Sequence, residues 1–192
     1  MSLARLLSLK LHECVDQVEQ IVDKAAKQAQ ISRQLHEMQC AWKEFAFEFV
    51  VEAEQDFPTF KIPEILVATI EEHQVMLQNL STNRFSSIYA GDVHCWLRIL
   101  AKVELMMTLL GDVQHTWLYL KDLFLCSADI KQQLPREQKQ FEQIDVEMRQ
   151  LLCAAQLTPN IIDLCFCDRL EEHLTELQAE LVLCQKALDG YL

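Results

Sequence analysis

A long apolar stripe between residues 96 and 124 limits what this chain can fold into. Its members recur at alternating steps of three and four residues, the spacing of one helix face, and they are Trp96, Leu100, Val103, Met107, Leu110, Val113, Trp117, Leu120 and Phe124. A second apolar flank consists of Ile99, Met106, Leu109 and Leu118. A helix that is apolar on more than one side is covered on more than one side, so this stretch is predicted to be the central helix of a bundle. At about 1.5 Å per residue it would run for roughly 40 Å, so the bundle should be elongated.

The central helix is predicted to open at Gly91 and Asp92 and to contain Gly111. Glycine inside a helix costs about 1 kcal/mol relative to alanine, so a kink or break at Gly111 is one alternative. We expect the helix to continue through it. Trp96 and Trp117 are expected to anchor the core rather than to bind a ligand.

The remaining composition also favours helices. Only three glycines and four prolines occur in 192 residues, which suits long helices joined by short turns and disfavours an all-β fold. Half of the residues are apolar, yet no run of about 18 uncharged apolar residues exists, so no membrane span is predicted. Without a signal peptide, the eight cysteines are expected to be free thiols in a reducing compartment, buried as small apolar residues.

The net charge of −12 is unevenly distributed. Residues 46–75 hold seven acids and one lysine, and residues 160–192 hold seven acids and two bases. The absence of a basic stripe argues against nucleic acid and against an anionic membrane as partners. The acidic segments are most simply solvated surface, and docking to a basic partner surface is the alternative.

The N-terminal 44 residues are predicted to be helical. Residues 3–29 form one expected helix with an apolar stripe at Leu3, Leu7, Leu11, Cys14, Val18, Ile21, Ala25 and Ala29. Residues 32–44 form a second helix, with Ser32 as its N-cap, and the two helices could be continuous. In residues 45–62 the period changes to two, with Phe45, Phe47, Phe49 and Val51 on one face. This alternation predicts a small β-hairpin that packs its phenylalanines against the helices.

Residues 63–192 are predicted to form a helical bundle. A helix over residues 64–80 begins after Pro63 and carries apolar residues at Ile65, Val67, Ile70, Val75, Leu77 and Leu80. Residues 127–134 are expected to be a turn. Pro135 should start the next helix, with one face formed by Phe141, Ile144, Met148, Leu151 and Ala155.

Thr158, Pro159 and Asn160 break that helix, and a short helical piece leads into the last one. The last helix has a heptad seam of Leu170, Leu174, Leu177, Leu181, Cys184, Leu188 and Tyr191. With barely three heptads, the seam is expected to pack within its own bundle rather than to form a separate coiled coil.

No catalytic motif is recognisable in the sequence. Phosphate-binding loops, nucleophile elbows, zinc-protease motifs and kinase motifs are missing, and the six histidines are dispersed. Cys165 and Cys167 alone are a weak metal signal, because a zinc site needs four ligands. We therefore predict no catalytic residue, no cofactor and no metal, and hence no enzyme.

Several motifs resemble the linker region of dynein heavy chains. One consists of two tryptophans, an aromatic-apolar segment, a Ser-Ala-Asp-Ile…Gln-Leu-Pro segment and a following phenylalanine, and its residues include Trp96, Trp117, Leu120, Phe124, Asp129, Ile130, Leu134, Pro135 and Phe141. A C-terminal motif contains Cys184, Lys186, Ala187, Leu188, Tyr191 and Leu192. The N-terminal segment is similar to axonemal outer-arm heavy chains of the beta type.

The resemblance implies a role and a location. In dynein motors a ring of AAA+ modules hydrolyses ATP, and a largely helical linker joins the ring to the tail and moves during the cycle. The chain would be the junction of tail and N-terminal linker, a single elongated helical unit over residues 1–192, with a hairpin, and a fragment of a larger protein. It would transmit force and perform no chemistry. Its partners would be the ring and tail of the same heavy chain, with intermediate and light chains as further candidates, in the cytoplasm and the axoneme of a cilium or flagellum. The rival interpretation is a freestanding helical scaffold that binds partner helices.

Overall fold

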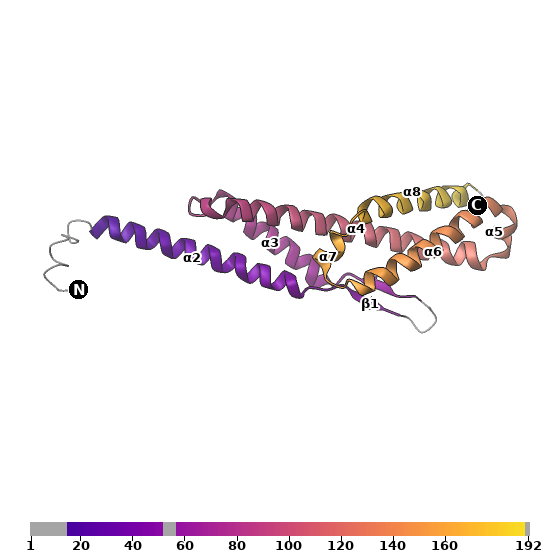
Figure 1. The fold of residues 1–192 in the computed structure, drawn as a ribbon. Coiled ribbons are helices and arrows are strands. Elements are labelled where there is room, and N and C mark those ends of the chain that lie inside the picture. The colour runs from indigo at the N-terminus through magenta and orange to yellow at the C-terminus, as the bar shows by residue number, and fades with distance from the viewer. Residues whose placement is uncertain (1–14, 52–56, 191–192) are drawn as a thin grey trace.

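The computed structural model describes residues 15–51 and 57–190. Within these ranges the chain forms seven α-helices and one two-stranded antiparallel sheet. The long helices lie roughly along a common direction and give the molecule an elongated shape (Figure 1). The predicted fold class, a mostly α, elongated bundle with one small hairpin, is confirmed.

Helix α4, Ala90–Cys126, is the central helix and has 37 residues. At about 1.5 Å per residue it is roughly 55 Å long. It continues through Gly111 without a break, as expected. Every member of the predicted stripe is buried in it except Trp96, which is only partly buried. Trp117 is therefore a core residue, as predicted. Trp96 is only partly buried, because fewer elements cover the N-terminal part of α4.

Helix α3, Glu64–Thr82, covers the N-terminal half of α4 and is joined to it by a 3₁₀ turn, η2, Ser87–Tyr89. Pro63 is the N-cap residue of α3 and lies just outside the first turn. The buried face consists of Leu66, Ile70, Leu77 and Leu80. Three of the apolar positions noted in the sequence are exposed, namely Ile65, Val67 and Val75. Ile70, Leu77 and Leu80, which were also noted in the sequence, are on the buried face, and Leu66 joins them there.

Helices α6, Pro135–Leu157, and α8, Leu170–Asp189, cover the C-terminal half of α4 (Figure 1). All five predicted residues of the α6 face are buried, and Pro135 stands in the first turn of α6. The heptad seam of α8 is buried from Leu174 to Leu188. The seam packs against α4 and α6, so the expectation that it stays within its own bundle is confirmed.

Residues 127–134 were expected to be a turn, and that prediction was wrong. Residues Ala128–Gln133 form a short helix, α5. The Ser127 hydroxyl caps α5 by accepting a hydrogen bond from the amide of Ile130, at 3.4 Å. Ile130 is buried. The burial of this side chain and the N-cap at Ser127 together stabilise the short helix.

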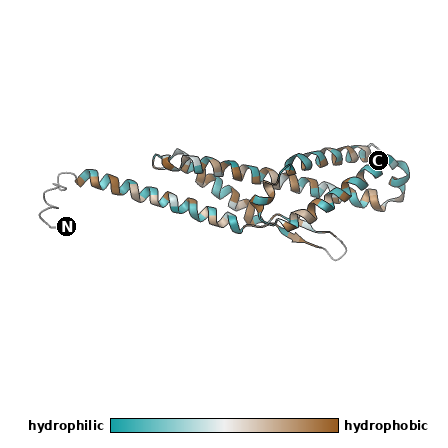
Figure 2. Ribbon diagram, in the orientation of Figure 1, coloured by the Kyte–Doolittle hydropathy of each residue, from teal (hydrophilic) through white to brown (hydrophobic). Residues whose placement is uncertain are grey.

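Helix α2, Val15–Glu44, is a single helix. Ser32 lies in its interior, so the predicted N-cap was wrong, and of the two alternatives left open the continuous helix is the one observed. Its C-terminal part buries Ile31, Leu35, Met38 and Trp42. Residues 15–26 are all exposed, including Val18 and Ile21 of the predicted stripe; the rest of that stripe before Val15 lies outside the described residues. Figure 2 shows hydrophobic and hydrophilic residues mixed along this part of α2.

The hairpin consists of β1, Glu48–Val50, and β2, Thr59–Lys61, with Phe49 opposite Phe60. Residues 52–56, between the two strands, lie outside the described residues. Phe47, Phe57 and Phe60 are buried, and the rings of Phe47 and Phe60 meet edge to face. Phe45 and Phe49 are partly buried and pack against the same core, so the predicted packing through the phenylalanines is confirmed. Val51, the last member of the predicted face, is exposed.

Candidate functional site

The end of α2, the hairpin, the short helix α7, Ile161–Cys165, and the middle of α4 meet in one region, which we call the junction. Asn160 is its polar centre. The Asn160 side-chain nitrogen donates to the carbonyl oxygens of Trp42, Lys43 and Phe45, at 3.4, 3.0 and 3.3 Å. Its oxygen accepts from the amides of Ile162 and Asp163, which caps α7. One amide side chain therefore ties the last carbonyls of α2 to the first amides of α7.

Backbone hydrogen bonds reinforce this attachment. The amide of Phe47 donates to the carbonyl of Pro159 at 2.9 Å, and the amide of Ile161 donates to the carbonyl of Phe45 at 3.1 Å. The chain leaving α2 thus runs beside the α6–α7 connection in a short antiparallel bridge. These bonds are directional, so a displacement of α2 along its axis strains them at once.

The hairpin is fixed to α4 by Gln114. The Gln114 oxygen accepts from the amide of Phe60, and the Gln114 nitrogen donates to the carbonyl of Phe60, both at 3.0 Å. These two bonds satisfy the backbone N–H and C=O of Phe60, which point away from β1. It also sets the position of the hairpin along α4.

Trp117 of α4 connects to α6 through a buried carboxylate. Its indole nitrogen donates to Oδ1 of Asp145 at 3.0 Å, and Nε of Arg149 donates to Oδ2 at 2.8 Å. Phe57 lies edge to face against Trp117, with ring centroids 4.9 Å apart. Lys121 and Arg149 lie over the Phe57 ring. Paired charges and cation–π contacts therefore hold the hairpin, α4 and α6 in one register.

Trp42 connects α2 to α3. Its indole nitrogen donates to Nδ1 of His73 at 3.0 Å, and its ring meets Phe45 edge to face. Burial lowers the pKa of His73, against an opposing effect of the Glu72 charge. The neutral imidazole, which can accept this hydrogen bond, is therefore favoured.

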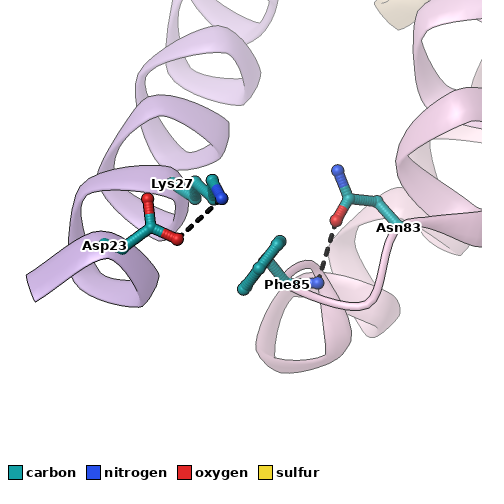
Figure 3. A network of polar contacts seen from close by, with 4 residues as sticks. All are labelled: Asp23, Lys27, Asn83 and Phe85. Atoms are coloured by element: carbon teal, nitrogen blue, oxygen red, sulfur yellow. Dashed lines mark hydrogen bonds and ion pairs between the residues drawn. The ribbon is translucent and has the colours of Figure 1, made fainter. Parts of the chain in front are cut away.

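A second attachment of α2 lies nearer its free half. Lys27 of α2 stands over the ring of Phe85, 4.8 Å from its centroid, and also forms an ion pair with Asp23 at 2.7 Å. Figure 3 shows Lys27 on one side and the Phe85 ring on the other, with the Phe85 amide donating to Asn83. The loop before α4 thus supports α2 roughly midway along its length.

The residues of the sequence motifs gather mainly at the far end of the bundle. Phe124 and Phe141 stack with centroids 5.2 Å apart, beside buried Leu120 and Ile130 and half-buried Leu134. Asp129 and Pro135 are exposed.

The C-terminal motif contributes to the same end. Cys184 and Leu188 are buried, Ala187 is half-buried and Lys186 is exposed. Burial, aided by the charges of Glu180 and Glu137, raises the pKa of Cys184 to about 11. Helix α8 packs against α6 here. Trp96 lies in the other half of α4, and Tyr191 and Leu192 lie outside the described residues.

The expectation that the cysteines are buried was wrong for most of them. Cys165 and Cys184 are buried, and burial raises the pKa of Cys165 to about 12. The exposed thiols are Cys40, Cys95, Cys126, Cys153 and Cys167. Cys14 lies outside the described residues. Four of these cysteines lie on outer faces of helices α2, α4 and α6, and Cys167 lies in the connection between α7 and α8; apolar spacing alone does not identify such positions.

Sequence reasoning did not find the residues that build the junction. Asn160 carried a detectable signal, because an asparagine after a proline and before an apolar run is a typical N-cap. Asp145 stood next to the apolar stripe of α6 without an obvious partner. Nothing in the sequence pointed to Gln114 or His73, because their partners are 54 and 31 residues away.

Residues 15–51 and 57–190 contain neither a metal-ligand cluster nor a membrane-spanning helix. No group of three or more histidine, cysteine or acidic side chains is arranged there to hold a metal ion. No helix there is both long enough and apolar enough to cross a membrane.

Comparison with known proteins identifies the family. The profile described as "Dynein heavy chain, N-terminal region 2" matches residues 1–192. The chain is 36% identical over its whole length to human dynein axonemal heavy chain 9 and 35% identical to the ciliary dynein beta chain of Tripneustes gratilla. It is 30% identical over 99% of its length to the beta chain of the flagellar outer arm of Chlamydomonas reinhardtii. The chain spans 4% of the length of each of these relatives. The resemblance to axonemal heavy chains of the outer-arm beta type is thus confirmed, and the chain belongs to the dynein heavy chain family, within its N-terminal region 2.

Proposed function

We propose that this chain is a non-catalytic mechanical segment of an axonemal dynein motor, which couples changes in an ATP-hydrolysing ring to the tail. The observation that carries the proposal is the uninterrupted helix α4, which is packed against α3 in one half and against α6 and α8 in the other. Close-packed interiors transmit strain. A helix of this length, covered along both halves, bends only by disturbing many contacts.

The junction supplies the other requirement, a firm entry point for force. Load arriving along α2 passes through Asn160 into α7 and α6, and through the hairpin and Gln114 into α4. The partners of such a segment are the ring and the tail of the same heavy chain, together with intermediate and light chains. The site of action is the axoneme of a cilium or flagellum, the setting in the names of the relatives.

The test is a complete heavy chain that carries Asn160→Ala and Gln114→Ala. These changes remove the junction hydrogen bonds and leave the apolar core of α4 intact. Microtubule gliding velocity and ATP turnover are measured on the same preparation. Gliding should slow while the ring continues to hydrolyse ATP. The matched control is Gln74→Ala, which removes an exposed bond between α3 and α4, to Glu104 at 2.9 Å, and should change neither quantity. Unchanged gliding in a double variant that melts as a folded protein would contradict the proposal.

A further inference from the structure

A cleft of about 730 Å³ lies between α6 and α8 near the end of α7. Its floor is apolar and includes Leu110, Leu151, Ala155 and Leu164. These residues are otherwise buried, so the cleft leads from the surface directly to the core. Apolar floors of this kind take up apolar side chains of a partner.

The rim of the cleft is acidic. Glu147, Asp168, Glu172 and Glu176 contribute carboxylates, and all four are exposed. The opposing groups are Arg169, whose guanidinium is 3.8 Å from Glu172, and His173, which is 3.3 Å from Glu147. Four carboxylates against one permanent cation leave the rim net negative. The charge excess of this acidic part of the chain therefore surrounds an apolar opening.

We propose that this cleft is a docking site for a basic amphipathic helix of a partner, which inserts apolar side chains between α6 and α8 and places lysines or arginines against the rim. The charge complementarity selects the occupant, because an acidic or neutral helix would leave the rim carboxylates facing apolar or like-charged groups. The site lies apart from the junction and adds a binding function to the mechanical one.

Cys167 provides a built-in reporter. It lines the cleft and is an exposed thiol, whereas Cys40 and Cys95 are exposed on α2 and on the N-terminal part of α4. The probe is a synthetic helical peptide of leucine, alanine and lysine, about 16 residues long, with a counterpart in which glutamate replaces lysine. The basic peptide should slow alkylation of Cys167 in the full chain and leave Cys40 and Cys95 unchanged.

Three variants distinguish binding of the basic peptide in the cleft from its nonspecific attraction to an acidic protein. Glu172→Lys with Glu176→Lys should weaken binding of the basic peptide by about tenfold or more at low salt. The control pair, Glu180→Lys with Asp189→Lys, changes the net charge by the same amount on the same helix but away from the cleft. This pair should weaken binding of the basic peptide far less. Ala154→Phe fills the cleft from an exposed position without changing charge, and should abolish protection of Cys167.

The outcomes decide the proposal. Protection of Cys167 by the basic peptide alone, lost in Ala154→Phe, supports it. Equal binding of the acidic peptide, equal effects of the two charge-reversed pairs, or unchanged binding in Ala154→Phe would each overturn it.

Discussion

The strongest test of the packing of the core is the replacement of Trp117 by phenylalanine. This change keeps a buried aromatic ring but removes the indole N–H that donates to Asp145 at 3.0 Å. Asp145 is 8% exposed, so water replaces that donor poorly. A hydrogen bond to a charged group contributes about 1.5–3 kcal/mol, and the smaller ring adds a cavity cost. We expect the free energy of unfolding to fall by about 2–4 kcal/mol.

The comparison variant is Trp42→Phe, which changes an equally buried tryptophan in the same way. The acceptor there is the neutral ring of His73, and a hydrogen bond between neutral groups contributes only about 0.5–1.5 kcal/mol. Urea unfolding followed by circular dichroism measures both variants. Trp117→Phe should be the more destabilising by about 1 kcal/mol. A loss for Trp117→Phe that is no larger than that for Trp42→Phe would refute the role assigned to the Asp145 carboxylate.

Two further predictions concern single side chains. Gly111→Ala should raise the free energy of unfolding by up to about 1 kcal/mol, because alanine favours the helix over glycine and the added methyl would stand in ordinary contact, 3.6 Å from Ile62. Gly91→Ala, in the first turn of α4, should raise the free energy of unfolding less. If Gly111→Ala proves destabilised in the same urea titration, the helical packing at Gly111 is contradicted. The lowered pKa of His73 means that the folded chain binds fewer protons than the unfolded one, so stability should be fully present above pH 6.5 and fall as the pH drops through the folded pKa. Melting curves between neutral and acidic pH should show a weaker pH dependence for His73→Gln, and identical slopes would be the contrary result.

The long elements could be predicted from the sequence because their apolar spacing repeats many times. The stripe of α4 and the seam of α8 each contain several turns of consistent spacing, and they are buried from Leu100 to Phe124 and from Leu174 to Leu188. The same reasoning failed for the first half of α2. Val18 and Ile21 fit a helical stripe, yet they are exposed, because spacing indicates a helix face but not whether another element of the chain covers it.

The junction could not be predicted for a different reason. Asn160 bonds to carbonyls 115 to 118 residues earlier in the chain. Such pairings depend on how whole helices are placed, which local pattern does not encode. Similarly, α5 depends on the burial of Ile130 under the end of the bundle. Residue type and spacing therefore predicted the helices, whereas the connections between them emerged only from the structure.

The claim that α4 is one stiff, continuous helix can be measured directly between two of its own cysteines. Cys95 and Cys126 are exposed on either side of Gly111. Spin labels there, in a chain whose other exposed cysteines are replaced by serine, report the distance by pulsed electron resonance. The 31 residue steps from Cys95 to Cys126 span about 46 Å in a straight α-helix. We expect a single narrow distribution near that distance. A broad distribution, or a second and shorter population, would mean that α4 bends at Gly111 and would contradict its role as a stiff force-bearing element.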